Sequence, residues 1–231
     1  MTHTPQPDIT LAVDANVIAA LKLFAGTHDL RAYLNGICLD IGPLESRLIA
    51  TDGTRMAAYR LAQPQPDVSE ALRGIIIPTE LFKPVKPYTR SSYNVHISIG
   101  QPAEHDPDHA RLVRVTSRGL TTTGTTIFGR YPDWRRAIPR QVSGQLAHYN
   151  ARIVGLLGKA YEVLHRGRYG YGPRIGHNGR DFALVDMGEP DMLCVIGPVR
   201  DAAGPSNAPD WVHDWSLGQS TAPEPAPAAA V

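Results

Sequence analysis

Two stretches of this sequence, residues 29–40 and 50–59, most restrict how the chain can fold. The first contains β-forming residues around an Asn35-Gly36 pair, which permits a bend or bulge. The second is centred on Asp52-Gly53, a strong turn signal, and predicts two strand ends joined by a tight turn. With Leu34 and Met56 meeting on one face, these stretches would form a small apolar cleft with a polar rim, suited to a short peptide.

The chain in order predicts three units, each a strand, a helix and three further strands, spaced by about 65 residues. In the first unit Asp14 can cap a helix that Gly26 can end, with Asn16 and Lys22 lying away from the buried stripe. That stripe has helical spacing and consists of Val17, Ile18, Leu21 and Phe24. The strands of this unit are expected at 9–13, around Tyr33 and Leu39, at 47–51 and at 54–61.

The second and third units repeat this order. The second has strands at 74–77, 95–99, 110–116 and 119–127, and a helix from Pro78 that Pro84 and Pro87 cut short. The third has a short strand at 144–148 and a helix capped by Asn150, followed by strands at 180–186 and 192–199. The apolar stripe of that helix consists of Ile153, Leu156, Leu157, Ala160 and Leu164.

Three ordered motifs resemble the bacterial DNA sliding clamp, the β subunit of the replicative polymerase. They are Asp-x-Arg-x-Tyr-Leu-Asn-Gly followed by Ala-Thr-Asp-Gly-x-Arg-x-Ala, then residues 129–139, then the last strand at 194–200. The resemblance implies an α+β, DNA-clamp-like fold with helices on one face of curved antiparallel sheets. It implies one clamp-like domain at 9–140, resembling the family's middle domain, and half of a second at 141–200, resembling the last half of its C-terminal domain. Counterparts of the family's first domain and of the half-domain before residue 141 are not recognised.

The resemblance also implies a peptide-binding cleft with an apolar floor and a few backbone-fixing donors. Gly197 and Asp201 depart from the family pattern, which usually has larger apolar residues at these positions. Replacing Leu34 or Met56 by glutamate is expected to abolish peptide binding and leave the protein folded. The full predicted set is Leu34, Thr51, Gly53, Thr54, Arg55, Met56, Pro132, Ala137, Val195, Gly197, Pro198, Val199 and Arg200.

A DNA-facing set follows from the same resemblance, on or beside the helices and in one loop. Such helices line the hole of a ring and contact the DNA backbone without reading bases. Solvated helix faces are the other interpretation of the same cations. The set consists of Lys22, Arg31, Tyr33, Lys83, Lys86, Arg152, Lys159, Arg166 and Arg168.

Composition indicates a globular chain whose first 200 residues are mildly basic, short of an obvious polyanion binder. The net charge is +1, and residues 1–200 hold 23 basic and 18 acidic residues, because the remaining acidic residues lie at 201–231. No run of eighteen apolar residues and no secretory pattern occurs, and both Cys38 and Cys194 fall in strand-like apolar runs, which suggests buried thiols in a cytoplasmic protein. Residues 1–8 and most of the Pro- and Ala-rich 201–231 are expected to be disordered.

Four other features of the sequence have more than one interpretation. A group of potential metal ligands includes two histidines with the i, i+4 spacing of a helical zinc pair, but Pro107 between them favours a solvated loop. The group consists of Glu104, His105, Asp106, Asp108 and His109. The basic, Tyr- and Gly-rich loop 166–173 suits single-strand stacking or a plain hairpin, without a nucleotide phosphate motif. Asp52 and Asp133 could form a catalytic pair, but turn and ion-pair roles explain them better. Trp211 and Trp215 in the tail could reach back into the cleft, bind a partner, or form a packed subdomain patch.

The sequence therefore predicts a non-enzymatic clamp-like protein without cofactor or metal. Its expected partners are double-stranded DNA, bound without sequence preference, further copies of itself, and a polymerase or other replication or repair protein that carries a clamp-binding peptide; no membrane is expected. The alternatives are a monomeric decoy that binds such peptides without encircling DNA and, least supported, an enzyme using Asp52 or the histidine loop.

Overall fold

The computed structural model describes residues 9–63, 72–88, 90–91, 93–102, 110–167, 170 and 172–199. All described residues belong to one compact unit. Predictions that concern 1–8, the 104–109 loop, Arg168, Arg200 and the tail with Trp211 and Trp215 fall outside the described residues. None of the described helices is long and apolar enough to cross a membrane.

The first repeat follows the predicted order of elements. The Asp14 side chain accepts a hydrogen bond from the amide of Asn16 at 2.7 Å and caps the first helix, as expected. The helix ends at Leu21, before Gly26, and Tyr33 lies in a turn of 3-10 helix instead of a strand. The elements are β1 (Ile9–Asp14), α1 (Ala15–Leu21), η1 (Ala32–Asn35), β2 (Gly36–Ile41), β3 (Ser46–Thr51) and β4 (Arg55–Leu61).

The second and third repeats depart further from the ideal unit. The helix of the second is a single 3-10 turn, as expected from Pro84 and Pro87. Its elements are β5 (Leu72–Pro78), η2 (Thr79–Phe82), β6 (Asn94–Pro102), β7 (Arg111–Ser117) and β8 (Leu120–Thr125). Those that follow are η3 (Trp134–Ala137), α2 (Ala151–Leu164), β9 (Arg174–Gly176), β10 (Ala183–Asp186) and β11 (Met192–Ile196).

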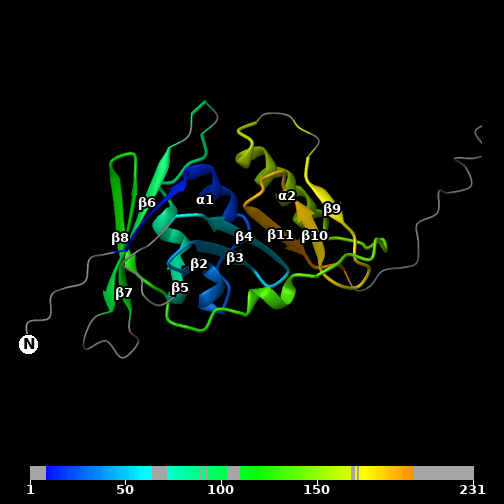
Figure 1. The fold of residues 1–231 in the computed structure, drawn as a ribbon, viewed down its shortest axis with the longest axis horizontal. Coiled ribbons are helices and arrows are strands. Elements are labelled where there is room, and N and C mark those ends of the chain that lie inside the picture. Colours follow the sequence, from blue (N-terminus) through cyan, green and yellow to red (C-terminus); the bar gives the residue numbers. More distant parts are fainter. Residues whose placement is uncertain are drawn as a thin grey trace, which may run out of the picture. The chain divides into compact units, whose positions relative to one another are not determined.

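The strands form two antiparallel sheets, in the orders β1-β6-β7-β8 and β5-β2-β3-β4-β11-β10-β9 (Figure 1). Each of the first two repeats places its first strand in the other repeat's sheet, because β1 pairs with β6 and β5 pairs with β2. The third repeat instead extends the seven-stranded sheet, through pairing of β11 with β4. The predicted α+β, clamp-like class is thus the observed one.

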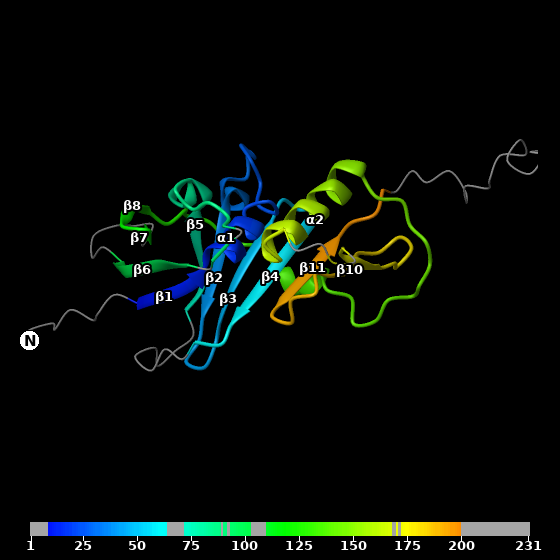
Figure 2. The same ribbon diagram turned by 90° about the horizontal axis from the view of Figure 1, so that it is seen from above.

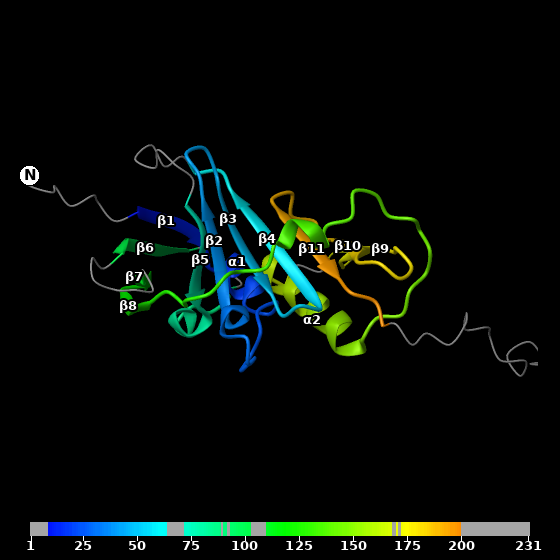
Figure 3. The ribbon, with the colours of Figure 1, turned by 90° about the horizontal axis from the view of Figure 1, so that it is seen from below.

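Apolar side chains cover both faces of the seven-stranded sheet. On one face α1 and α2 lie next to each other and share the main core with residues of both sheets (Figure 2). On the other face a second cluster lies under the segment that contains η3, which crosses β4 and β11 (Figure 3). This second cluster consists of Cys38, Ile49, Met56, Ala58, Ile76, Tyr131 and Val195.

Two further sequence predictions are wrong, and one strand was missed. Residues 144–148 form no strand; they lie beside β9, where the Gly144 amide donates to the His177 carbonyl at 3.0 Å. The short strand β9 itself was not predicted. Asn16 does not face away from the core: it is buried, and its side-chain amide exchanges two hydrogen bonds with the backbone of Tyr88, at 3.1 and 2.9 Å.

Candidate peptide-docking site and DNA-facing residues

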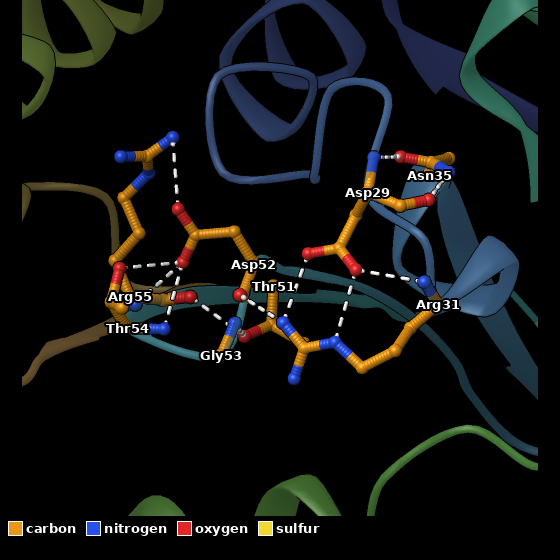
Figure 4. Close-up of polar contacts among 8 residues, drawn as sticks. All are labelled: Asp29, Arg31, Asn35, Thr51, Asp52, Gly53, Thr54 and Arg55. Atoms are coloured by element: carbon orange, nitrogen blue, oxygen red, sulfur yellow. Dashed lines mark hydrogen bonds and ion pairs between the residues drawn. The ribbon is translucent and has the colours of Figure 1, made fainter.

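The turn between β3 and β4 is held by its own side chains (Figure 4). One carboxylate oxygen of Asp52 accepts hydrogen bonds from the Thr54 amide, the Thr54 hydroxyl and the Arg55 amide, at 2.8, 2.7 and 3.0 Å. The Thr51 hydroxyl donates to the Arg55 carbonyl at 2.7 Å and accepts from the Gly53 amide at 3.0 Å. Gly53 has a φ of 92°, which a residue with a side chain adopts only with strain. Asp52 is therefore a turn residue, as the sequence suggests.

The loop at 29–35 is attached to this turn through Arg31. Its guanidinium pairs with both carboxylate oxygens of Asp29, at 3.0 and 2.9 Å, and donates to the Asp52 carbonyl at 3.4 Å (Figure 4). Asn35 closes the loop by donating to the Asp29 carbonyl and accepting from the Asp29 amide. The Arg31 side chain, predicted to face DNA, is thus exposed but already paired with a carboxylate.

Titration of Asp29 tests this loop. Hydrogen bonds from the side chain and backbone of Arg31 lower the pKa of Asp29 from 3.8 to about 2. A depressed carboxyl pKa means that the pair stabilises the fold above about pH 4 and that this contribution is lost as the pH falls toward about 2. We expect Arg31→Gln to return the Asp29 pKa toward 3.8, measured by NMR on the carboxyl carbon. Arg47→Gln, on another turn, should leave it unchanged; an unchanged pKa in Arg31→Gln would contradict the pairing.

The last strand joins this turn region from far along the chain. In the sheet Met56 lies directly between Thr51 of β3 and Val195 of β11. Beyond the end of β11, the Gly197 amide donates to the Thr54 carbonyl at 2.7 Å, and the Val199 amide donates to the His148 carbonyl at 2.7 Å. The two most separated parts of the predicted peptide-binding set are therefore neighbours in space.

The segment that follows β8 supplies the third part of the set. The Ile127 amide donates to the Ile76 carbonyl at 2.8 Å, and the buried Tyr131 hydroxyl donates to the Ile49 carbonyl at 3.2 Å. Burial raises the pKa of the Tyr131 hydroxyl, so it remains a donor at neutral pH. These two contacts hold Pro132 and Ala137 over the outer face of the sheet, where Ala137 packs against the second cluster.

The structure divides the predicted peptide-binding residues into two layers. Leu34, Met56 and Val195 are 1%, 3% and 0% exposed, and Thr51 is also buried, so solvent does not reach these four side chains. Thr51, Met56 and Val195 are neighbours in the sheet and form a buried floor. Of the others, Arg55, Ala137, Gly197 and Pro198 are half-buried, and Gly53, Thr54, Pro132 and Val199 are exposed. The predicted set thus has a buried part and a solvent-facing part, and docking of a peptide at these residues stays a prediction.

Two aromatic residues that were not predicted lie against this set. A Cβ atom added to Gly197 would lie 3.3 Å from a ring carbon of Phe182, so the ring packs closely against this glycine. Phe182 and Trp134 both pack against the second cluster. The Trp134 indole N–H is buried and without a hydrogen-bond partner among the described residues. Alternation of Phe182 with Leu184 along the chain was the available signal for Phe182. A cavity of about 680 Å³ lies along 128–135, beside Cys38, Asp40 and Arg73, and includes Pro132 alone of the predicted set.

The predicted DNA-facing cations are dispersed and partly paired. The Lys22 ammonium is half-buried and donates to the Phe82 carbonyl at 2.9 Å, and burial, then nearby Lys86, lowers its pKa. Lys22 and Lys83 line a common cavity of about 510 Å³, in which Lys83 pairs with Glu80 at 3.4 Å.

On the second helix Arg152 and Lys159 are exposed, and Arg166, just after it, pairs with Asp14 at 3.4 Å. Lys86 is exposed, and Tyr33 is half-buried and packs against the second cluster. Among the described cations of the set, Arg31, Lys83, Lys86, Arg152 and Lys159 are exposed, and Arg31 and Lys83 are each paired with a carboxylate.

The remaining residues that could have taken part in catalysis or metal binding have structural roles. Cys38 and Cys194 are buried free thiols, and burial raises the pKa of both. Asp133 forms an ion pair with Arg136 at 3.2 Å. Within the described residues there is no group of three or more His, Cys, Asp or Glu that could hold a metal ion.

Residues 9–133 match the model of the DNA polymerase III beta subunit, central domain. This match covers more than half of the chain. The chain belongs to this sliding-clamp family. Among curated relatives, the beta sliding clamp of Vibrio cholerae is 31% identical over 142 residues, 61% of this chain and 36% of that protein. The beta sliding clamp of Pseudomonas aeruginosa is 31% identical over 114 residues, 49% of this chain and 28% of that protein.

Solved sliding clamps share the fold over more of the chain. The Borrelia burgdorferi DNA polymerase III subunit beta aligns with a TM-score of 0.58 at 14% identity, over 87% of this chain and 67% of that one. The Pseudomonas aeruginosa sliding clamp bound to griselimycin aligns with a TM-score of 0.57 at 17% identity, over 87% and 68%. The likeness in fold therefore extends past residue 133, whereas the chain spans only about a third of the length of the curated relatives it matches.

Proposed function

We propose that this chain is a sliding-clamp-like tether without enzymatic activity. Copies of it assemble into a ring around double-stranded DNA, and each copy docks a short peptide of a polymerase or another replication or repair protein. The observation that supports this proposal best is the pairing of β4 with β11, which brings residues 51–56 and 195–199 to one site in a member of the sliding-clamp family.

The docking surface has the properties that a short linear peptide requires. Its buried floor is apolar and rigid, because Met56 and Val195 lie in register within a continuous sheet. Above the floor, Val199 and Pro132 offer exposed apolar area, and Arg55 is a nearby cation. Such peptides bind weakly and exchange, yet attachment to a DNA-bound ring raises the effective concentration of the partner at the template.

The opposite face suits DNA held without sequence preference. Helices α1 and α2 cover that side of the sheet, and Arg152 and Lys159 on α2 are exposed. Exposed cations on a helical face attract the phosphate backbone through long-range electrostatics and read no bases. A ring needs only such loose contact, because closure around the duplex prevents its escape.

Peptide docking is tested with a fluorescent peptide that carries a Gln-x-x-Leu-Phe-like core. Val199 is 43% exposed, so Val199→Glu should weaken binding at least about tenfold without unfolding the protein, since a charge would face the peptide's apolar side chains. Leu44→Glu is the matched control: Leu44 is 79% exposed in the turn at the opposite end of β3, and binding should be unchanged. If Val199→Glu bound the peptide as tightly as Leu44→Glu does, the proposed docking site would be wrong.

Encirclement is tested by retention on DNA. After long incubation with nicked circular plasmid, the protein should withstand a high-salt wash that screens backbone contacts, and cutting the plasmid once should release it. Equal release from circular and linear DNA would remove the ring and leave peptide docking to be explained by a monomeric, decoy-like protein.

A further inference from the structure

The cavity of about 680 Å³ lies where β2 and β5 meet the segment that follows β8 and crosses the sheet (Figure 3). A register shift between Leu39 and Ile41 interrupts the pairing of β2 with β5 at this point, and the Gly74 amide donates to the Asp40 side chain at 3.0 Å. A Cβ atom added to Gly74 would meet no atom within 4 Å, so the cavity is open beside this glycine. Irregular strand pairing often lies beside binding sites, and the volume is within the roughly 300–1,000 Å³ of ligand pockets.

Both acidic side chains that line this cavity are already held in ion pairs. The Asp40 side chain is 12% exposed and pairs with Arg135 at 3.5 Å. Asp133 is more exposed and pairs with Arg136 at 3.2 Å. The negative charges of the cavity are therefore balanced by these two arginines, and any further cation in it adds a positive excess.

Two further arginines supply that excess. Arg73 and Arg130 line the cavity and are exposed, and neither forms an ion pair with a residue that the structure describes. Phe128, which lines the same cavity, is 71% exposed. A guanidinium group binds a carboxylate or a phosphate through two parallel N–H donors. The cavity therefore suits an anionic ligand that also has an apolar group to place on the Phe128 ring.

The aromatic side chains of the cavity favour an acidic peptide over a single-stranded nucleic acid. A site for single strands stacks successive bases on several open aromatic faces along a cationic groove. Here Tyr131 is buried and donates to the Ile49 carbonyl, and the Arg135 guanidinium lies over the Trp134 ring, 4.2 Å from its centroid. Of the aromatic residues that line the described cavity, Phe128 alone is exposed. One open ring beside two free cations matches one apolar side chain with acidic neighbours.

The cavity meets the proposed docking site at Pro132, which is exposed and belongs to both. We propose that the cavity receives an acidic segment beside the docked core of the partner's peptide. The carboxylates of that segment pair with Arg73 and Arg130, and an apolar neighbour lies on Phe128. This inference rests on the proposed function and adds to it a preference for partners with acidic residues next to the core. Exposed cations at this position also steer such partners toward the site before they dock.

Matched peptides test this preference on the full chain. Three fluorescent peptides share a Gln-x-x-Leu-Phe-like core and carry a pair of glutamates, glutamines or lysines beside it, first at one end and then at the other. At one of the two ends the glutamate peptide should bind about fivefold more tightly than the glutamine peptide, because exposed Arg–carboxylate pairs contribute modestly to affinity. High salt should remove this difference by screening the charges. Equal affinities of the glutamate and glutamine peptides at both ends would overturn the proposal.

Charge reversal tests whether the preference comes from this cavity. Arg73→Glu combined with Arg130→Glu should make the lysine peptide the tightest ligand of the three, a reversal that a loosened fold would not produce. Arg90→Glu combined with Arg152→Glu is the matched control, because both arginines are exposed, lie outside the cavity and change the net charge equally. The control should keep the preference for glutamate. A preference for glutamate that persists in the cavity variant would contradict the assignment.

The same measurements separate this inference from the proposed function. Binding of all three peptides without a charge preference would remove this inference and leave the docking site in place. Failure of every peptide to bind would remove the docking site and this inference with it. A thymidine oligonucleotide that binds more tightly than the glutamate peptide, and that loses binding when Arg73 and Arg130 are reversed, would assign the cavity to nucleic acid instead.

Discussion

Replacing Met56 by glutamate should lower the free energy of unfolding by about 3–5 kcal/mol, enough to unfold many domains of this size. Met56 is 3% exposed and packs in the second cluster beneath the η3 segment, so the carboxylate would be enclosed by apolar side chains. The adjacent Arg55 is already committed to Asp52 at 3.2 Å and to the Leu23 carbonyl. The introduced charge would therefore have no ready partner.

Urea denaturation measures this effect and offers two controls. Met56→Leu conserves volume and should cost less than about 1.5 kcal/mol. Val199→Glu introduces the same charge at an exposed position and should cost about 0.5 kcal/mol or less. The penalty for Met56→Glu should shrink as the pH is lowered toward 4, because a buried carboxyl has a raised pKa and becomes neutral. A penalty no larger than that of Val199→Glu would contradict the burial of Met56.

This result also changes how the peptide site must be tested. A sequence-based prediction holds that glutamate at Leu34 or Met56 abolishes docking in a folded protein, but both side chains lie in the interior. Loss of binding in such a variant would report unfolding as much as docking. Substitution of the exposed Val199 separates the two, because its side chain supports no core contact of the described fold.

Local signals in the sequence account for most of the elements. Asp14 and Asn150 have the side chains that cap helices, and both accept the expected amide hydrogen bond. Asp52-Gly53 specifies its turn through short-range bonds that depend on nothing outside residues 51–55. Such features are decided within a few residues, so they are readable without the rest of the molecule.

Depth of burial and long-range pairing were not readable in this way. Asn16 is polar and was placed on the exposed side of its helix, but the backbone of Tyr88, distant in sequence, satisfies both ends of its amide. Residues 144–148 have a strand-like composition, yet their partner, the short β9 hairpin, offers them only isolated hydrogen bonds. The proximity of β4 and β11 came from family motifs, since no local pattern of either strand specifies the other.

Substituting alanine for Asp52 should be the second large effect, lowering the free energy of unfolding by about 2–3 kcal/mol. The carboxylate accepts three hydrogen bonds within the turn and pairs with Arg55. The loss of stability is reduced because the Thr54 amide lies at the surface, where water can replace the carboxylate as its hydrogen-bond partner. The Arg55 amide is partly buried, and its guanidinium also donates to the Leu23 carbonyl, so the link between the turn and the segment after α1 weakens as well.

Asp52→Asn is the matched control, because its amide oxygen keeps an acceptor for the turn amides and loses only the charge. It should cost roughly half as much as alanine when both are compared by urea denaturation. The same turn carries the Thr54 carbonyl that accepts from Gly197, so Asp52→Ala should also weaken peptide binding by loosening the start of the 197–199 segment. Unfolding midpoints and peptide affinities equal to those of the native chain in both variants would show that the turn does not depend on this carboxylate and that the docking site is held together elsewhere.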